Sequence, residues 1–159
     1  MDKRISLKRE KNKRACKKEI PDLSHDDTIR YLKEYFIEDK NVNMNIKNLI
    51  YYEIKKKLDS YKRQDIKKNK YNHDVFISLD ECYSKLLSSN MNCYYCKNKM
   101  VLLYNFSRQE NQWTLERLNN SIGHSNDNTV VSCLDCNLKR GTRNSDSFQF
   151  AKQLVIKKV

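Results

Sequence analysis

Between residues 22 and 89 the apolar residues recur every three or four positions, which is the spacing of amphipathic helices. The segment 23–40 shows this spacing, with Ser24 as a candidate N-cap and acidic residues in the first turn. The segment 41–71 repeats it over a longer stretch, and its polar face is rich in lysine. The apolar positions of the two segments are Ile29, Leu32, Tyr35, Phe36, Ile46, Leu49, Ile50, Ile54 and Leu58. We expect two helices that each bury this face.

Two further helices are predicted, one before and one after the cysteine-rich part of the chain. Residues 75–89 combine a candidate N-cap, Ser78, with Glu81 at the third helical position, which is the pattern of a capping box. The last helix is expected after residue 144, with Ser145 or Ser147 as its cap. The apolar residues that would dock it on the core are Phe148, Ala151, Leu154 and Val155.

In the second half of the chain, short apolar runs of strand length replace the helical spacing. A short strand is expected after the first cysteine pair, within residues 97–106, and two more in residues 112–118 and 128–133. A loop rich in Gly and Asn separates the last two strands. Residues 134–140 then suit a helix that stops at Gly141. This order of elements predicts an α+β fold behind a helical N-terminal region.

The charge balance of the chain indicates a polyanionic partner. Its 159 residues include 32 Lys and Arg against 20 Asp and Glu, a formal net charge of +12. Such an excess is typical of proteins that bind nucleic acid or an anionic membrane surface. Residues 1–20 are strongly basic and lack apolar spacing, which leaves two interpretations open: a solvated tail, or an arm that orders on DNA or RNA.

Four of the six cysteines form two Cys-x-x-Cys pairs, Cys93/Cys96 and Cys133/Cys136. Thiolates spaced in this way bind a zinc ion two at a time, and four of them complete a closed tetrahedron. A closed site has no open position, so we expect this zinc to be structural. The 36 residues between the pairs are more than a simple zinc ribbon contains, so a folded unit is expected between them.

Several polar residues occupy set positions between and after these pairs. Glu116 and Arg117 are adjacent in the first strand of the expected hairpin, Asn128 stands at the start of its second strand, and Asn137 directly follows the last cysteine. With the bracketing cysteine pairs, this spacing resembles the HNH nucleases, the ββα-metal or His-Me finger superfamily. It is most similar to the zinc-stapled variety that includes the phage Holliday-junction resolvase. The resemblance covers roughly residues 90–145 and implies a ββα-metal core.

The resemblance implies metal-assisted hydrolysis of phosphodiester bonds, most naturally in DNA. Glu116 falls where the family has its acidic metal ligand, and Asn137 falls where it has the second ligand. Together they would hold a catalytic Mg²⁺ or Mn²⁺ ion. Such an ion neutralises charge on the phosphate and stabilises the leaving oxygen. Asn128 matches the family's Asn that braces the hairpin loop.

Arg117 departs from the family's pattern, because a His that acts as general base is usual at its position. An arginine keeps its proton, with a pKa above ~12, so it is a poor base. It would instead grip the scissile phosphate or stabilise the transition state. His124 in the hairpin loop is the nearest residue for the role of base, and an ordinary loop hydrogen bond is the alternative for it.

Basic residues gather around the helix that follows the last cysteine. Lys139, Arg140 and Arg143 come shortly after Asn137, and Arg108 precedes the hairpin. These side chains are expected to bind backbone phosphates, and a solvated helix end is the alternative. Three functions are considered: an HNH-type endonuclease, which we favour, a non-catalytic zinc-containing nucleic-acid-binding protein on a decayed HNH scaffold, and a structural zinc module that binds protein.

We expect the chain to divide into a basic arm (residues 1–20), a helical region (21–89), a zinc-stapled HNH-like domain (90–145) and a C-terminal helix (146–159). No apolar run approaches the ~18–20 residues of a membrane span, and the basic N-terminus lacks the apolar core of a secretory signal. We therefore expect an intracellular protein of the cytoplasm or nucleus, not secreted, that contacts no membrane. A viral origin and a homodimer are left open.

Overall fold

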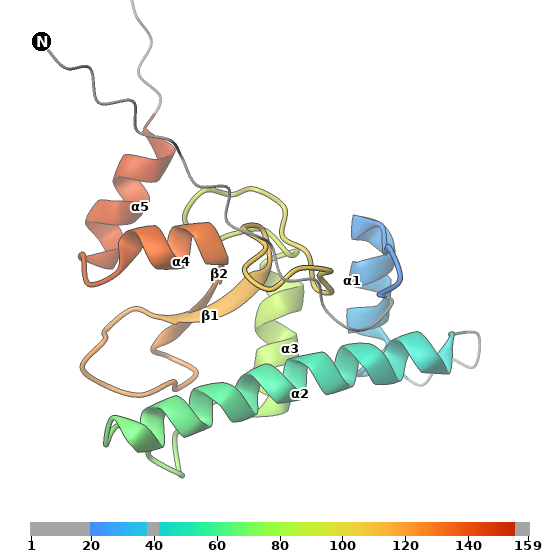
Figure 1. Ribbon diagram of the computed structural model, residues 1–159, viewed down its shortest axis with the longest axis horizontal. Helices are drawn as coiled ribbons and strands as arrows, with labels where there is room; N and C mark the ends of the chain where they lie inside the picture. The colour runs from blue at the N-terminus through green and yellow to red at the C-terminus, as the bar shows by residue number, and fades with distance from the viewer. Residues whose placement is uncertain (1–19, 38–41, 155–159) are drawn as a thin grey trace, which may run out of the picture.

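The computed structural model describes residues 20–37 and 42–154. They form five helices and one two-stranded antiparallel sheet (Figure 1), so the predicted α+β class is confirmed. The elements are α1 (His25–Lys33), α2 (Met44–Lys67), α3 (Leu79–Ser88), β1 (Trp113–Arg117), β2 (Thr129–Cys133), α4 (Leu134–Arg140) and α5 (Ser145–Gln153). The basic arm predicted for residues 1–20 lies outside the described residues, apart from its last residue.

Polar side chains cap the first three helices. At the start of α1, Ser24 Oγ accepts the backbone N–H three residues on, at 3.0 Å, as predicted. At the start of α2, Asn43 Oδ1 accepts two backbone N–H groups of the first turn. At the start of α3, Ser78 and Glu81 form the predicted capping box, with N···O distances of 3.2 and 2.8 Å. These caps satisfy backbone donors that the first helical turn leaves unpaired.

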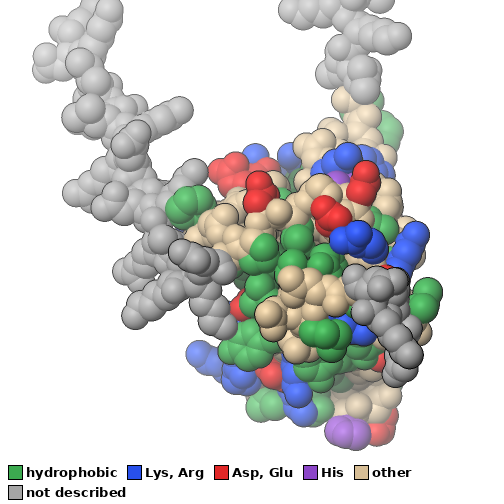
Figure 2. Space-filling view, turned by 90° about the vertical axis from the view of Figure 1, so that its right-hand side faces the viewer, with side chains coloured by type: hydrophobic (Ala, Val, Ile, Leu, Met, Phe, Trp, Pro, Cys, Tyr) green, Lys and Arg blue, Asp and Glu red, His purple; other side chains and the backbone are tan. Residues whose placement is uncertain are grey.

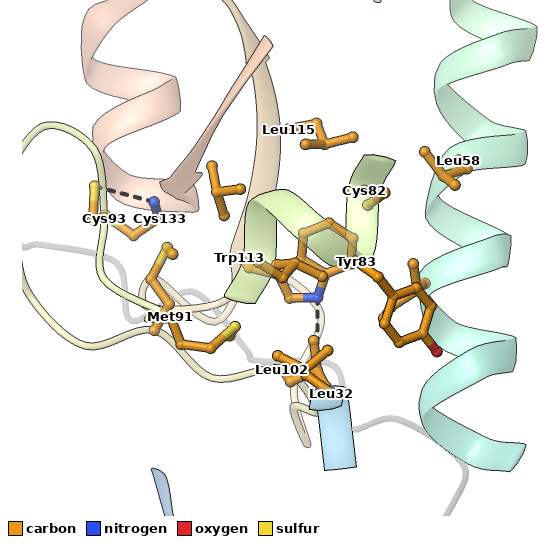
Figure 3. Packing of buried hydrophobic residues seen from close by; sticks show 14 of the residues in the cluster. Leu32, Leu58, Cys82, Tyr83, Met91, Cys93, Leu102, Trp113, Leu115 and Cys133 are labelled. Atoms are coloured by element: carbon orange, nitrogen blue, oxygen red, sulfur yellow. Dashed lines mark hydrogen bonds between the residues drawn. The ribbon is translucent and has the colours of Figure 1, made fainter. Parts of the chain in front are cut away.

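The core lies around α3, which packs against α1, α2 and β2. Figure 3 shows Trp113 of β1 at its centre, close to Tyr83 of α3 and Leu102. The Trp113 ring is fully buried, and its Nε1 donates a hydrogen bond to the Leu102 carbonyl at 3.2 Å. Four of the residues predicted from the helical spacing to be buried lie in this core, namely Leu32, Ile50, Ile54 and Leu58. No helix of the described ranges is long and apolar enough to cross a membrane.

The hairpin separates α2 from α4, which lie on its opposite sides (Figure 1). In its register Trp113 pairs with Cys133 and Glu116 pairs with Val130. Because successive side chains of a strand point to opposite faces, β1 presents alternate residues to the two helices. Arg117 reaches α2, whereas Glu116 reaches α4. The two adjacent residues that carry the nuclease resemblance therefore lie in different environments.

The prediction of a strand within residues 97–106 is wrong. This segment makes only isolated bridges, one from Lys99 to Asn92 and one from Val101 to Gln112. The reason is that each contact lasts for a single residue before the chain turns away. Val101 exchanges hydrogen bonds with Asn111 and Trp113, and its neighbours do not continue the ladder. An apolar run of strand length therefore packs here as irregular backbone.

The predictions for both terminal helices need correction. The helix predicted over residues 23–40 ends at Lys33 and is followed by turns. The cap of α5 is Asn144, whose Oδ1 accepts the Ser147 N–H at 3.0 Å, rather than either of the two serines predicted. Ser145 is instead buried beside Tyr95, with their hydroxyl oxygens 3.2 Å apart. Of the apolar residues expected to dock α5, Phe148 is buried, Ala151 and Leu154 are exposed, and Val155 lies outside the described residues.

Lys57 joins the middle of α2 to the start of β1. Its Nζ lies 4.5 Å from the ring centroid of Trp113 and 4.8 Å from that of Tyr104. It also donates hydrogen bonds to the Trp113 carbonyl and to Gln112 Oε1. Burial lowers the pKa of Lys57 to about 7, although Glu53 opposes this shift. Lys57 therefore links folding stability to pH near neutrality.

We expect the protein to become more stable as the pH rises above about 7. The folded chain releases the Lys57 proton near pH 7, whereas an unfolded lysine holds its proton to about pH 10.4. In this interval the unfolded state binds more protons, so raising the pH favours the folded state by up to about 1.4 kcal/mol per pH unit. Urea unfolding between pH 6 and 9 measures this slope. Lys57→Met should flatten it, and an unchanged slope in that variant would contradict the assignment.

Candidate metal centre and the two polar faces of the hairpin

The four predicted zinc ligands come together where the hairpin meets α4. The sulfur atoms of Cys93, Cys96, Cys133 and Cys136 all lie within 4.8 Å of one another. A tetrahedron of Zn–S bonds of about 2.3 Å has edges of about 3.8 Å, and the Cys96 and Cys133 sulfurs are 3.9 Å apart. The cluster thus has the size and the ligands of a structural site for a metal such as zinc. Within the described ranges, no other group of His, Cys, Asp or Glu side chains offers such a cluster.

Backbone hydrogen bonds hold these cysteines in place. Cys133 ends β2 and caps α4, where its Sγ accepts the Cys136 N–H at 3.4 Å. The Cys133 N–H in turn donates to Cys93 Sγ at 3.3 Å, the dashed contact in Figure 3. Hydrogen bonds from Cys133 lower the pKa of the Cys93 thiol, whereas burial raises the pKa of Cys136; a thiolate is the form that binds zinc. Cys82 lies in the core of α3, where burial raises its pKa to about 12, so it stays a thiol.

Glu116 is buried on the α4 side of the hairpin. Its Oε1 accepts a hydrogen bond from Arg140 Nη1 at 2.7 Å, and its Oε2 accepts one from Ser132 Oγ at 3.2 Å. Burial raises the pKa of Glu116, and the hydrogen bond from Arg140 opposes that rise. Arg140 also donates to the carbonyls of Arg117 and Leu118, while its buried Nε has no hydrogen-bond partner in the described structure. The predicted acidic ligand is therefore paired with a guanidinium from α4.

The two predicted asparagines have different roles. Asn137 lies on α4, one turn before Arg140, and its Nδ2 donates to Thr114 Oγ1 of β1 at 3.1 Å. Asn128 braces the hairpin loop, as the resemblance implies. Its Oδ1 accepts the Asn119 N–H at 2.9 Å, and its Nδ2 donates to the carbonyls of Asn119 and Gly123.

Arg117 and His124 meet at the same carboxylate on the α2 side of the hairpin. Asp65 of α2 is fully buried, and both of its oxygens lie 2.9 Å from His124 Nδ1. The backbone N–H of His124 donates to the same carboxylate at 2.6 Å, and Arg117 Nη1 lies 3.5 Å from it. Tyr61 stacks on the imidazole, with ring centroids 4.7 Å apart. Burial lowers the pKa of His124, although Asp65 opposes the shift.

This geometry does not bring His124 to Glu116. Glu116 contacts α4 and His124 contacts α2, on opposite sides of the hairpin (Figure 1). The side chain of Arg117 is only 11% exposed and is turned toward Asp65. Neither the expected arginine grip on phosphate nor the replacement base is therefore assembled around Glu116 in this structure.

Asp65 is the site residue that the sequence analysis missed. A signal was present, because Asp65 continues the helical spacing of Ile54 and Leu58 on the buried side of α2. An acid in an apolar stripe is rarely buried without a partner. The partner could not be read from the sequence, because His124 lies 59 positions further on.

Of the basic residues proposed for phosphate contact, three are exposed and one is buried. Lys139 pairs with Asp135 at 2.8 Å, Arg143 donates to carbonyls at the end of α4, and Arg108 stands in the loop before β1. Arg140 is 3% exposed and forms a salt bridge with Glu116 instead. On the face seen in Figure 2, Lys and Arg side chains lie among apolar and acidic ones rather than in a single patch.

Neither a family model, nor a curated protein, nor a solved structure matches this chain. The resemblance to the HNH nucleases therefore rests on the residues and their spacing.

Proposed function

We propose that this protein is an HNH-type endonuclease that hydrolyses phosphodiester bonds, with DNA as its substrate and a divalent ion as its cofactor. The observation that carries the proposal is the buried polar layer between the hairpin and α4, where Glu116 of β1 faces the helix of Asn137. A carboxylate and a guanidinium are costly to bury in a small domain. A chemical role for this layer explains why both groups are buried here.

The order of elements supports the proposal. Two antiparallel strands lead directly into a short helix. One cysteine pair precedes this unit and the other lies at the junction of β2 and α4. Asn128 holds the loop between the strands through three hydrogen bonds. A hairpin fixed at both ends keeps the side chains of β1 and α4 in register, which catalysis requires.

The donor set fits a hard cation. Glu116 offers carboxylate oxygens, and Asn137 offers its Oδ1, since its Nδ2 is the group that donates to Thr114. Mg²⁺ needs few protein ligands, since it keeps several of its waters. When bound, such an ion neutralises charge on the phosphate. Arg140 must release Glu116 Oε1 for this, and its guanidinium is then free to bind a phosphate oxygen.

A second candidate function is binding of nucleic acid without catalysis on the same scaffold. The Glu116–Arg140 pair favours it, because a guanidinium already compensates the carboxylate that the ion would use. Arg117 favours it too, since it is held by Asp65 and takes no proton from water. Both candidates require phosphate contacts, so binding should weaken steeply with salt in either case.

Nicking of plasmid DNA in Mg²⁺ or Mn²⁺ tests the first candidate. The wild-type protein should nick, and Glu116→Gln and Asn137→Ala should each lower the rate by about 100-fold or more, since each removes a group that stabilises transition-state charge. Glu110→Gln, a change at an exposed acid just before β1, should leave the rate unchanged. Circular dichroism melting confirms that each variant is folded.

Two outcomes would reject the endonuclease. One is the absence of nicking of supercoiled, single-stranded and branched DNA in both metals. The other is nicking that survives both substitutions in folded protein. In the first case, retained salt-sensitive DNA binding would establish the second candidate.

A further inference from the structure

A cavity of about 410 Å³ lies between the C-terminal end of α2, the turn that follows it and the β1–β2 loop. Its walls come from within residues 65–76 and 121–125. It is on the α2 side of the hairpin, so it is separate from the Glu116–Arg140 layer on the α4 side (Figure 1). Cavities of this size hold small ligands.

Hydrogen bonds and a close backbone approach fix the walls of the cavity to each other. The backbone N–H of Ile77 donates to the His124 carbonyl at 2.9 Å, and the Lys70 side chain donates to the Asn120 carbonyl. Between these contacts, Gly123 passes so close to the turn after α2 that a Cβ there would lie 2.4 Å from the Lys70 carbonyl oxygen. Only glycine fits this approach. The cavity is therefore formed before any ligand enters.

His124 brings an imidazole ring to the wall of the cavity. Its Nδ1 lies against the Asp65 carboxylate, which only accepts hydrogen bonds, so Nδ1 carries a proton. The contact with Asp65 fixes the orientation of the ring in the wall.

Aromatic and amide side chains line the same cavity. The rings of Tyr71 and Phe76 lie 5.4 Å apart, and Lys62 Nζ lies 5.0 Å from the Tyr71 ring centroid. Asn69 and Asn72 add groups that both donate and accept hydrogen bonds. Planar bases stack on such rings, which contributes roughly 1–3 kcal/mol per base. This combination of rings, amides and an imidazole suits a nucleobase.

The surroundings of the cavity are positively charged. Residues 62–74 form the end of α2 and the following turn. They contain Lys62, Arg63, Lys67, Lys68 and Lys70. Of the two acids in that stretch, Asp65 is compensated by Arg117 and Asp74 is exposed. An anionic ligand is favoured at such a place.

We propose that this cavity binds one unpaired nucleotide, with its base against Tyr71 and Phe76, its polar edge toward His124 and its phosphate toward the lysines. The ligand class rests on the proposed function, which makes nucleic acid the partner. A base inside a duplex cannot enter, since its faces and its pairing edge are occupied. The cavity therefore selects single-stranded, flipped-out or terminal nucleotides.

Titration with adenosine 5′-monophosphate, followed by the imidazole NMR signals, tests the proposal. In a His25→Gln/His73→Gln double variant, the imidazole signal that remains is that of His124. Neither of the replaced residues lines the cavity. We expect this signal to shift and saturate at millimolar nucleotide or below. Ribose 5-phosphate, which lacks the base, should bind at least about tenfold more weakly.

A pair of tryptophan variants locates the site. Val75 lines the cavity and is 54% exposed, so Val75→Trp should block the entrance without disturbing the core, and raise Kd at least about tenfold. Ile37→Trp, at a 63% exposed position that does not line the cavity, should leave Kd within about twofold. The proposal is overturned if the signal does not saturate, if ribose 5-phosphate binds equally well, or if Val75→Trp binds as the wild type does.

The nicking assay measures DNA cleavage, whereas the titration measures nucleotide binding by the cavity. Loss of nicking with retained nucleotide binding rejects the endonuclease and supports the cavity. Retained nicking without nucleotide binding rejects the cavity alone.

Discussion

Cys133→Ser is expected to empty the metal site and to unfold the hairpin together with α4. Binding of structural zinc supplies about 10–16 kcal/mol in small zinc domains, whereas a domain of this size has a total stability of only about 5–15 kcal/mol. Cys133 also joins three elements, because it ends β2, caps α4 and donates its N–H to Cys93. Elemental analysis of the purified protein and urea unfolding measure both effects.

Cys82→Ala is the matched control for this substitution. It removes a fully buried thiol from α3, outside the metal cluster, so it should retain the wild-type metal content. Its stability should fall by only about 1 kcal/mol, as for a small cavity. If Cys133→Ser retains one equivalent of zinc and a cooperative unfolding transition, the assignment of this cysteine as a ligand is wrong.

Asp65→Asn is expected to lower the free energy of unfolding by about 3 kcal/mol. The substitution keeps the shape of the side chain but removes its charge, which leaves Arg117 without a counter-ion in a largely buried site. In the wild type, the backbone N–H and the ring Nδ1 of His124 both contact the carboxylate oxygens of Asp65. An asparagine has only one such oxygen, so one of these hydrogen bonds is lost. Urea unfolding measures the loss, and hydrogen exchange of residues 121–125 should show that the hairpin loop opens from α2.

Asp59→Asn provides the control, since Asp59 is exposed on the same helix and should change stability by less than about 0.5 kcal/mol. Adding Arg117→Met to Asp65→Asn should recover part of the lost stability, because the buried guanidinium is then gone. Equal stability of Asp65→Asn and the wild type would show that the carboxylate does not hold the loop. Strict additivity of the two substitutions would show that the two side chains are not coupled.

The sequence predicted the helices well wherever an apolar stripe and a polar cap occur together. Ser78 with Glu81 marked the start of α3, and the stripe through Ile54 and Leu58 marked the buried side of α2. These signals are local, because a cap and a helix face both depend on residues three or four positions apart. The residues after the first cysteine pair carry a strand-like composition, but a strand needs a partner along its length, and the spacing of a single segment does not reveal one.

The candidate site shows the same division between local and long-range information. The cysteine pairs could be read as one metal site because each pair is a compact signal. The pairing of Glu116 with Arg140, and of Arg117 with Asp65, could not be read, because each depends on which face of the hairpin meets which helix. The two neighbours in sequence end in separate salt bridges on opposite sides of a sheet.

The hairpin is held by two long-range contacts, Asp65 with His124 and Cys93 with Cys133, and forming one affects the entropic cost of forming the other. The contact between Asp65 and His124 closes a loop of 59 residues, and that between Cys93 and Cys133 closes one of 40. Once a metal joins the cysteines, the shortest path along the chain and through the metal from Asp65 to His124 falls to roughly 40 residues, which reduces the entropic cost of closure by about 0.3 kcal/mol. A metal bound by the cysteines would therefore lower the entropic cost of bringing His124 to Asp65, at a cavity that contains none of its ligands. We expect the cysteine cluster to affect the closure of this loop as well as the stability of the folded chain.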